Sequence, residues 1–214
     1  MVEVQHHGFS FEKWVCDKFF GGYAGCYMQK WDVPQSENRH SQVPCDLRGL
    51  PVSVKAVKYG APIALGDALR QYSIDEPFLL IVGFWCQRSE SEKWFEEMAC
   101  AKIDPGLWKQ LWGRLESEDL LKLDQIVKTQ STPYAEARSQ AREWKKLTFA
   151  SSASQIVINP KIDSKNQRRV QCSLPFRVFW KVVGREAGVA DAPTLFGVEF
   201  DNPVISSSRS FTRD

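Results

Sequence analysis

A continuous apolar run, FLLIVGF at positions 78–84, constrains the fold of this chain more than any other feature. It is bounded by Pro77 and by polar residues, which is typical of a strand covered on both faces. Helices are then needed on the faces of the sheet that contains it. The 214 residues are enough for one domain with a full core. We therefore expect an α/β fold with a mixed β-sheet flanked by helices.

Periodicity and turn residues predict the order of elements in the first half of the chain. The order is helix, strand, strand, strand, helix, strand, with expected positions 10–20, 24–31, 45–47, 51–58, 63–72 and 78–84. The second and third strands would form a hairpin that turns at Arg48 and Gly49. The second half favours one more strand at 94–103, three helices, and two strands at 154–162 and 168–174.

We expect a single domain over residues 1–214 that contains three regions. The catalytic core would span 9–86, a largely helical insertion 104–149, and a β-containing C-terminal region 154–205. The formal net charge is only +2, so the net charge by itself does not indicate a nucleic-acid partner. The six cysteines lack zinc-ligand spacing, and the sequence shows neither a signal peptide nor a membrane-spanning run. These features favour a soluble cytoplasmic protein without a membrane partner.

The segment Val43–Lys58 gathers polar groups that a purely structural hairpin would not need. Side chains alternate along a strand, so Ser53 and Lys55 are predicted to share one face, opposite Val52 and Val54. The expected hairpin would fold Asp46 back towards them. A carboxylate, a hydroxyl and an ammonium would then converge at the end of a sheet.

This set of groups suits metal-dependent phosphodiester hydrolysis. Mg²⁺ prefers oxygen ligands and needs only one or two carboxylates when the substrate phosphate completes its shell. Asp46 would supply a carboxylate, the carbonyl of Val54 a neutral oxygen, and Lys55 the cation that stabilises charge near the attacking water.

These residues resemble the PD-(D/E)XK nuclease superfamily, and type II restriction endonucleases in particular. Pro44-Cys45-Asp46 stands before Ser53-Val54-Lys55, and the predicted element order matches the αβββαβ core of that superfamily. The resemblance implies Asp46 as metal-binding aspartate, Lys55 as catalytic lysine, Glu12 as a helix-borne acid of the metal site, and Gln71 as a polar helix residue near it. Mg²⁺ would be the cofactor.

Two departures from the superfamily pattern leave alternatives open. Cys45 stands between Pro44 and Asp46, and Ser53 occupies the place of the second acid. Serine binds metal weakly, so the number of metal ions is open. Asp32, at the end of the preceding predicted strand, competes with Asp46 for the role of metal aspartate.

A second polar segment, Asn159–Ser173, is rich in cations and amides. Lysine and arginine neutralise phosphates, while Asn, Gln and Arg form bidentate contacts to base edges. We expect DNA contacts here, or else a solvated basic hairpin. The candidate residues are Lys161, Lys165, Asn166, Gln167, Arg168, Arg169 and Gln171.

The sequence thus predicts a Mg²⁺-dependent endonuclease that cuts double-stranded DNA, of type II restriction class. The alternatives are a structure- or damage-directed DNA nuclease, and a catalytically weak DNA-binding module on the same fold. A palindromic target would imply a homodimer. The resemblance also implies a cognate DNA methyltransferase that protects the host.

Overall fold

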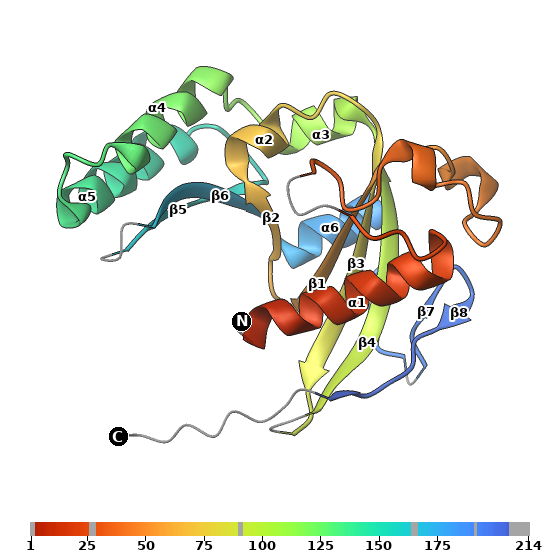
Figure 1. Cartoon of the computed structure of the whole chain (residues 1–214). Coiled ribbons are helices and arrows are strands. Elements are labelled where there is room, and N and C mark those ends of the chain that lie inside the picture. The colour runs from red at the N-terminus through yellow and green to blue at the C-terminus, as the bar shows by residue number, and fades with distance from the viewer. Residues whose placement is uncertain (1–2, 26–28, 90–91, 164–166, 191, 206–214) are drawn as a thin grey trace. The chain divides into compact units, whose positions relative to one another are not determined.

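The computed structural model describes residues 3–25, 29–89, 92–163, 167–190 and 192–205 (Figure 1). These residues form a mixed α/β structure with six α-helices and three sheets. The chain divides into two compact units. The first unit comprises Met1–Ala61, Pro77–Ile103 and Trp180–Asp214, and the second comprises Pro62–Glu76 and Asp104–Phe179. The segment 62–76, expected within the catalytic core, therefore belongs to the second unit.

The first unit is built on a four-stranded mixed sheet with the order β1-β3-β4-β9. Its strands are β1 (Val52–Lys58), β3 (Phe78–Gln87), β4 (Glu92–Ile103) and β9 (Val204–Ile205). β1 runs parallel to β3, and the other two pairs are antiparallel. Every residue from Phe78 to Phe84 is buried, which confirms the strand predicted there. The expected mixed sheet flanked by helices is also confirmed.

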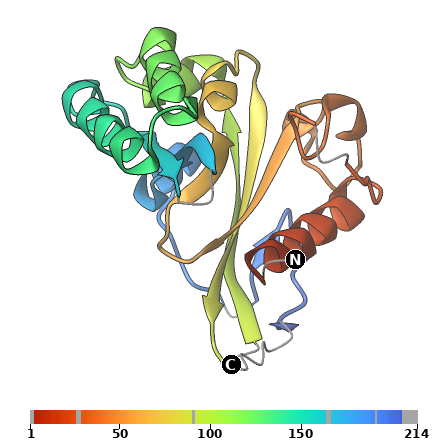
Figure 2. The same ribbon diagram turned by 60° about the vertical axis from the view of Figure 1, so that its left-hand side comes forward.

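Helix α1 (Glu3–Phe19) covers one face of this sheet (Figures 1 and 2). The ring of Phe11 stacks on Phe95 of β4 with 4.9 Å between the centroids. Gly83 of β3 makes room for this stack, because a Cβ at that position would lie 2.7 Å from the rings of both phenylalanines. The next residue, Phe84, points to the opposite face, where it contacts Trp180 of α6 (Phe176–Val183) with ring centroids 5.3 Å apart.

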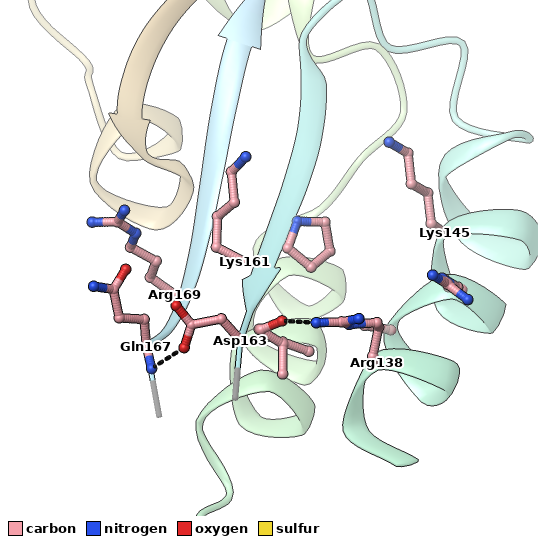
Figure 3. A pocket seen from close by; sticks show the side chains of 10 residues that line it. Arg138, Lys145, Lys161, Asp163, Gln167 and Arg169 are labelled. Atoms are coloured by element: carbon pink, nitrogen blue, oxygen red, sulfur yellow. Dashed lines mark hydrogen bonds between the residues drawn. The ribbon is translucent and has the colours of Figure 1, made fainter. Parts of the chain in front are cut away.

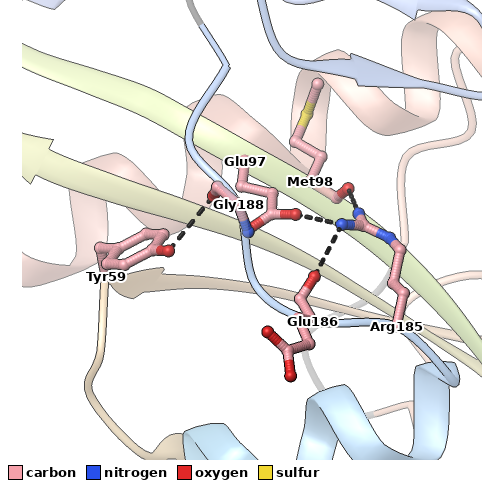
Figure 4. A network of polar contacts seen from close by, with 6 residues as sticks. All are labelled: Tyr59, Glu97, Met98, Arg185, Glu186 and Gly188. Carbon is pink, nitrogen blue, oxygen red and sulfur yellow. Dashed lines mark hydrogen bonds and ion pairs between the residues drawn. The ribbon is translucent and has the colours of Figure 1, made fainter.

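A polar network ties the segment after α6 to β4 (Figure 4). The carboxylate of Glu97 is buried, and it accepts hydrogen bonds from Arg185 Nη1 and, at 2.7 Å, from the backbone N–H of Gly188. Tyr59 Oη donates to the carbonyl of Gly188 at 3.2 Å. A buried carboxylate needs such partners, so this network fixes the path of residues 185–188. The unit also contains the short hairpin β7 (Thr194–Leu195) and β8 (Val198–Glu199).

The second unit contains a three-stranded antiparallel sheet with the order β2-β6-β5. Helices α4 and α5 pack against each other and against β5 and β6. The buried positions of these two helices are Leu120, Leu123 and Val127 of α4, and Ala137, Ala141 and Trp144 of α5. The elements are β2 (Ile63–Asp67), α2 (Ala68–Tyr72), α3 (Pro105–Leu111), α4 (Ser117–Lys128), α5 (Tyr134–Trp144), the π-helical turn η3 (Lys145–Phe149), β5 (Val157–Ile162) and β6 (Arg168–Leu174).

The sequence predicted three strands before residue 60, but among the described residues only β1 forms there. Cys45–Leu47 is a 3-10 helix (η2), so the predicted hairpin is wrong. The Asn38 side chain, which is fully buried, donates to the carbonyls of Leu47 and Leu50, both at 2.8 Å, and these bonds hold the segment as a compact loop. A second 3-10 helix, η1 (Gln35–Glu37), lies just before it. Of the strand expected at 24–31, residues 26–28 lie outside the described residues, and the others are irregular.

The helix predicted over 63–72 is correct only in its second half. Ile63–Asp67 pairs with β6, and helix α2 begins after Asp67, whose Oδ1 accepts a 2.9 Å bond from the N–H of Arg70. Gly66 has a φ of +97° at a register shift of the sheet. That left-handed conformation is incompatible with a continuous helix, and the apolar residues before it complete the sheet instead.

Candidate functional site

The structure brings Asp32 next to β1, because its neighbour Val33 pairs with the first residue of that strand. Val33 and Val52 form an isolated antiparallel bridge with N–H to carbonyl distances of 3.1 and 2.8 Å. Val33 and Val52 are both fully buried. The burial of this pair therefore fixes the backbone next to Asp32 and, with it, the position from which the Asp32 side chain extends.

The Oδ2 atom of Asp32 receives three hydrogen bonds from consecutive residues of β1. Ser53 Oγ donates at 3.2 Å, the backbone N–H of Val54 at 2.6 Å, and Lys55 Nζ at 2.9 Å. Val52 and Val54 are buried in the core that includes Phe11, whereas Ser53 and Lys55 are half-buried, as the alternation predicts. All three donors contact Oδ2, so none of them occupies Oδ1.

The Lys55 ammonium is held by two acceptors. Besides Asp32 Oδ2, Nζ donates to the carbonyl of Val54 at 2.9 Å. The side chains of Lys55 and Asp32 are only 25% and 28% exposed, so the pair interacts more strongly than an ion pair in open solvent. An ammonium has three donors, and the described residues accept from two of them. The third remains for a substrate oxygen or a water molecule.

Glu12 extends the charged cluster from helix α1. It directly follows Phe11, the residue that packs α1 against the sheet. Its pKa is raised above the ordinary value, mainly by burial and next by repulsion from Asp32, while the positive charge of Lys55 acts in the opposite direction. Two carboxyl groups and one ammonium thus share a partly desolvated site, and the carboxylates repel each other.

The donor set fits a hard divalent cation that is completed by substrate and water. Within the described residues, no cluster of three or more His, Cys, Asp and Glu side chains could hold a metal ion. Two carboxylates with a backbone carbonyl still match the few protein ligands that Mg²⁺ usually takes beside phosphate oxygens. Asp32 Oδ1, Glu12 and the carbonyl oxygen of Val54 are the candidate ligands.

Asp46 does not join this cluster. It is exposed on η2, and among the described residues the salt bridge of Lys55 is made with Asp32 rather than with Asp46. The expectation that Asp46 folds back on Lys55 depended on a hairpin that does not form. Asp32, the alternative acid in the sequence, contacts Lys55 because the Val33–Val52 bridge holds it next to β1.

Gln71 lies in α2 of the second unit, and its backbone carbonyl accepts a 2.8 Å hydrogen bond from Trp108 Nε1. This contact anchors α3 to α2 within that unit. Nothing in the structure assigns the side chain of Gln71 a catalytic contact, so its role near the site stays a prediction.

The predicted DNA-contacting residues fall into different structural classes. Arg168 is half-buried, and its guanidinium donates to the carbonyls of Val127, Thr129 and Thr132 around the end of α4. Arg168 therefore stabilises the structure around the end of α4. Lys161, Gln167 and Arg169 are exposed, Gln171 is half-buried in β6, and Lys165 and Asn166 lie outside the described residues.

Three further cations, which the sequence did not indicate as site residues, lie opposite the antiparallel pair β5–β6. Arg138, Arg142 and Lys145 belong to α5 and the turn after it, and they line one pocket together with Lys161 and Arg169 (Figure 3). Their spacing of four and then three residues is the signal that places them on one helix face.

Comparison of the chain with protein-family models, with curated proteins and with solved structures gives no match. In the described part of the chain, no helix is both long and apolar enough to cross a membrane. The functional conclusion therefore depends on the geometry of the site.

Proposed function

We propose that this protein is a Mg²⁺-dependent endonuclease that hydrolyses phosphodiester bonds in double-stranded DNA, of the type II restriction class. The observation that carries the proposal is the convergence of Ser53, Val54 and Lys55 on one oxygen of Asp32. Glu12 of α1 interacts electrostatically with both Asp32 and Lys55. A half-buried cluster of this kind costs desolvation energy. Its position on a strand edge next to a loop is suited to chemistry more than to stability.

Each side chain has a distinct role in this proposal. When bound, Mg²⁺ would neutralise charge that develops on the phosphate and make water nucleophilic at neutral pH. Asp32 and Glu12 supply the negative charge that holds the cation, and the carbonyl of Val54 adds a neutral oxygen. Lys55 directs its remaining N–H at the attacking water or at a phosphate oxygen. Ser53 keeps Asp32 in place by donating to Oδ2.

Ser53 also supports a second candidate function. It contributes a hydrogen bond where the superfamily has a second acid, so the site offers fewer charged ligands. A catalytically weak DNA-binding module on this fold is the alternative that follows from that observation. A structure- or damage-directed nuclease would use the same cluster on a different DNA substrate.

The partners belong to the same proposal. Cleavage of a palindromic site would be carried out by a homodimer, since the symmetry of the protein matches that of the site. A host with such an enzyme in its cytoplasm needs a cognate methyltransferase to protect its own DNA.

The test is digestion of plasmid and phage DNA with Mg²⁺ or with EDTA, using wild type, Lys55→Ala and the control Lys58→Ala. Lys58 is an exposed lysine on the same strand. Discrete bands from wild type and Lys58→Ala alone support a restriction enzyme, and a smear indicates cleavage without sequence preference. Retained DNA binding with no cutting by wild type would refute the enzyme and favour the binding module.

A further inference from the structure

The second unit contains a pocket of about 380 Å³ between α5 and the β5–β6 hairpin (Figure 3). Of the ten described residues that line it, five carry a positive charge and one carries a negative charge. The five are Arg138, Arg142, Lys145, Lys161 and Arg169, and the acid is Asp163. The chain as a whole has a net charge of only +2, so this concentration of cations is local.

The cations are placed where they repel one another. Arg138 and Arg142 are four residues apart on α5, and like charges at that spacing destabilise a helix. Lys161 and Arg169 are direct partners across the β5–β6 pair, where like charges are also unfavourable. Within the described residues, no salt bridge reaches Arg142, Lys161 or Arg169. An anion bound in the pocket would attract the cations of α5 and those of the β5–β6 pair, and so offset the repulsion among them.

Two of the cations are held in place by the strand that they face. Arg138 Nη2 donates to the carbonyl of Ile162 at 2.7 Å, and Lys145 Nζ donates to the carbonyl of Ile158 at 2.9 Å. These bonds join α5 and the turn after it to β5. The other three, Arg142, Lys161 and Arg169, are exposed, and in the described part of the chain their side chains make no hydrogen bond.

The lining favours a polyanionic backbone over a small nucleotide. None of the ten lining residues is aromatic, so a nucleobase finds no ring on which to stack. Arg138, Arg142 and Lys145 extend over about 10 Å along the helix, at ~1.5 Å per residue. One DNA strand presents a phosphate every ~3.4 Å of axis, so a row of this length parallel to the duplex axis would cover about three phosphate spacings.

We infer that this pocket binds the phosphodiester backbone of duplex DNA without reading its sequence. The inference rests on the proposed function in that the duplex held here is the substrate to be cut. The backbone would supply the negative charge that the five cations need beyond the single acid, Asp163. Phosphate contacts of this kind set affinity and orientation.

The test is fluorescence anisotropy with a labelled DNA duplex of about 20 base pairs, in EDTA, over a range of salt concentrations. The pocket variant is Arg142→Gln/Lys161→Gln/Arg169→Gln. The matched control, Lys109→Gln/Lys122→Gln/Arg177→Gln, removes the same charge from exposed positions of the same unit outside the pocket. Thermal unfolding of both variants verifies that they fold.

We expect the pocket variant to lose about tenfold or more in affinity, and its slope of log K against log salt to fall by about 1 for each cation removed. The control should bind within about twofold of wild type. Equal losses in both variants would refute the inference, because only net charge would then matter. Saturable binding of inorganic phosphate that the pocket variant loses, with duplex binding unchanged, would also refute it and indicate a small phosphorylated ligand.

The two proposals fail in different ways. EDTA prevents cleavage during the binding measurement, so duplex affinity does not depend on catalysis. Pocket-dependent binding without any Mg²⁺-dependent cutting would refute the nuclease alone. Cutting by wild type, with a salt slope that the pocket substitutions leave unchanged, would refute the pocket alone.

Discussion

Lys55 Nζ lies 2.9 Å from Asp32 Oδ2, although 23 positions separate the two residues in the chain. Both side chains are about three-quarters buried, and the same carboxylate oxygen also accepts from the N–H of Val54. An acid held in this way by strand β1 is a fixed part of the site. Asp46, which is nearer in sequence, is exposed on a 3-10 helix.

The first prediction separates the two acids. Asp32→Asn should lower the rate of Mg²⁺-dependent DNA cleavage by about 10²-fold or more, because the variant loses the charge beside Lys55 that would hold the cation. Asp46→Asn should cleave at the wild-type rate. Initial rates of supercoiled-plasmid nicking measure both. A larger loss of cleavage rate in Asp46→Asn than in Asp32→Asn would identify Asp46 as the metal-binding acid instead.

The second prediction concerns pH and Glu12. Its pKa is raised in the folded protein, so charging it costs more there than in the unfolded chain. The stability penalty is absent below the ordinary glutamate pKa and grows as pH rises through the folded-state pKa. In EDTA, Glu12→Gln should therefore be more stable than wild type at about pH 7.5 and equal to it at about pH 4.

Urea unfolding at the two pH values measures this difference. Asp17→Asn, an exposed acid on the same helix, is the control and should show no comparable gain. A Glu12→Gln variant that is less stable than wild type near neutral pH would contradict the prediction.

The third prediction concerns the contact that seats α1 on the sheet. Gly83→Ala should destabilise the protein by about 1–3 kcal/mol, because the new methyl group would meet the buried rings of Phe11 and Phe95. A Cβ at Gly106 of α3 would have no atom within 4 Å apart from its chain neighbours and the nearby helix backbone, so Gly106→Ala should be neutral or slightly stabilising. Chemical denaturation compares the two. Equal free energies of unfolding for the two variants would mean that α1 moves to accommodate the methyl group at position 83 without loss of stability.

The fourth prediction separates two adjacent arginines. Arg168→Met should cost about 1–3 kcal/mol, since it leaves three carbonyls around the end of α4 without their charged donor. Arg169→Met should change stability by less than about 0.5 kcal/mol, as is usual at an exposed position. Thermal and urea unfolding report both. If Arg168→Met weakened DNA binding while leaving stability unchanged, Arg168 would be a contact residue after all.

Much of the local structure follows from the sequence. The buried strand at Phe78–Phe84, the strand that carries Ser53 and Lys55, and the helices α3, α4 and α5 are all predicted by the period of their apolar residues. Errors occur where apolar pattern and backbone geometry disagree. Residues 63–67 have an apolar pattern compatible with a helix, but Gly66 adopts a left-handed conformation and the segment pairs with β6.

The sequence by itself determined which strand carries the lysine and which of its side chains share a face, because alternation is a local property of the backbone. Only the tertiary structure decided which acid meets that lysine. The choice depends on the bridge between Val33 and Val52 and on the loop held by Asn38, which are contacts between residues far apart in the chain. Arg168 and Arg169 show the same division. The sequence presents two adjacent cations, and packing against the end of α4 makes one of them structural while the other stays exposed.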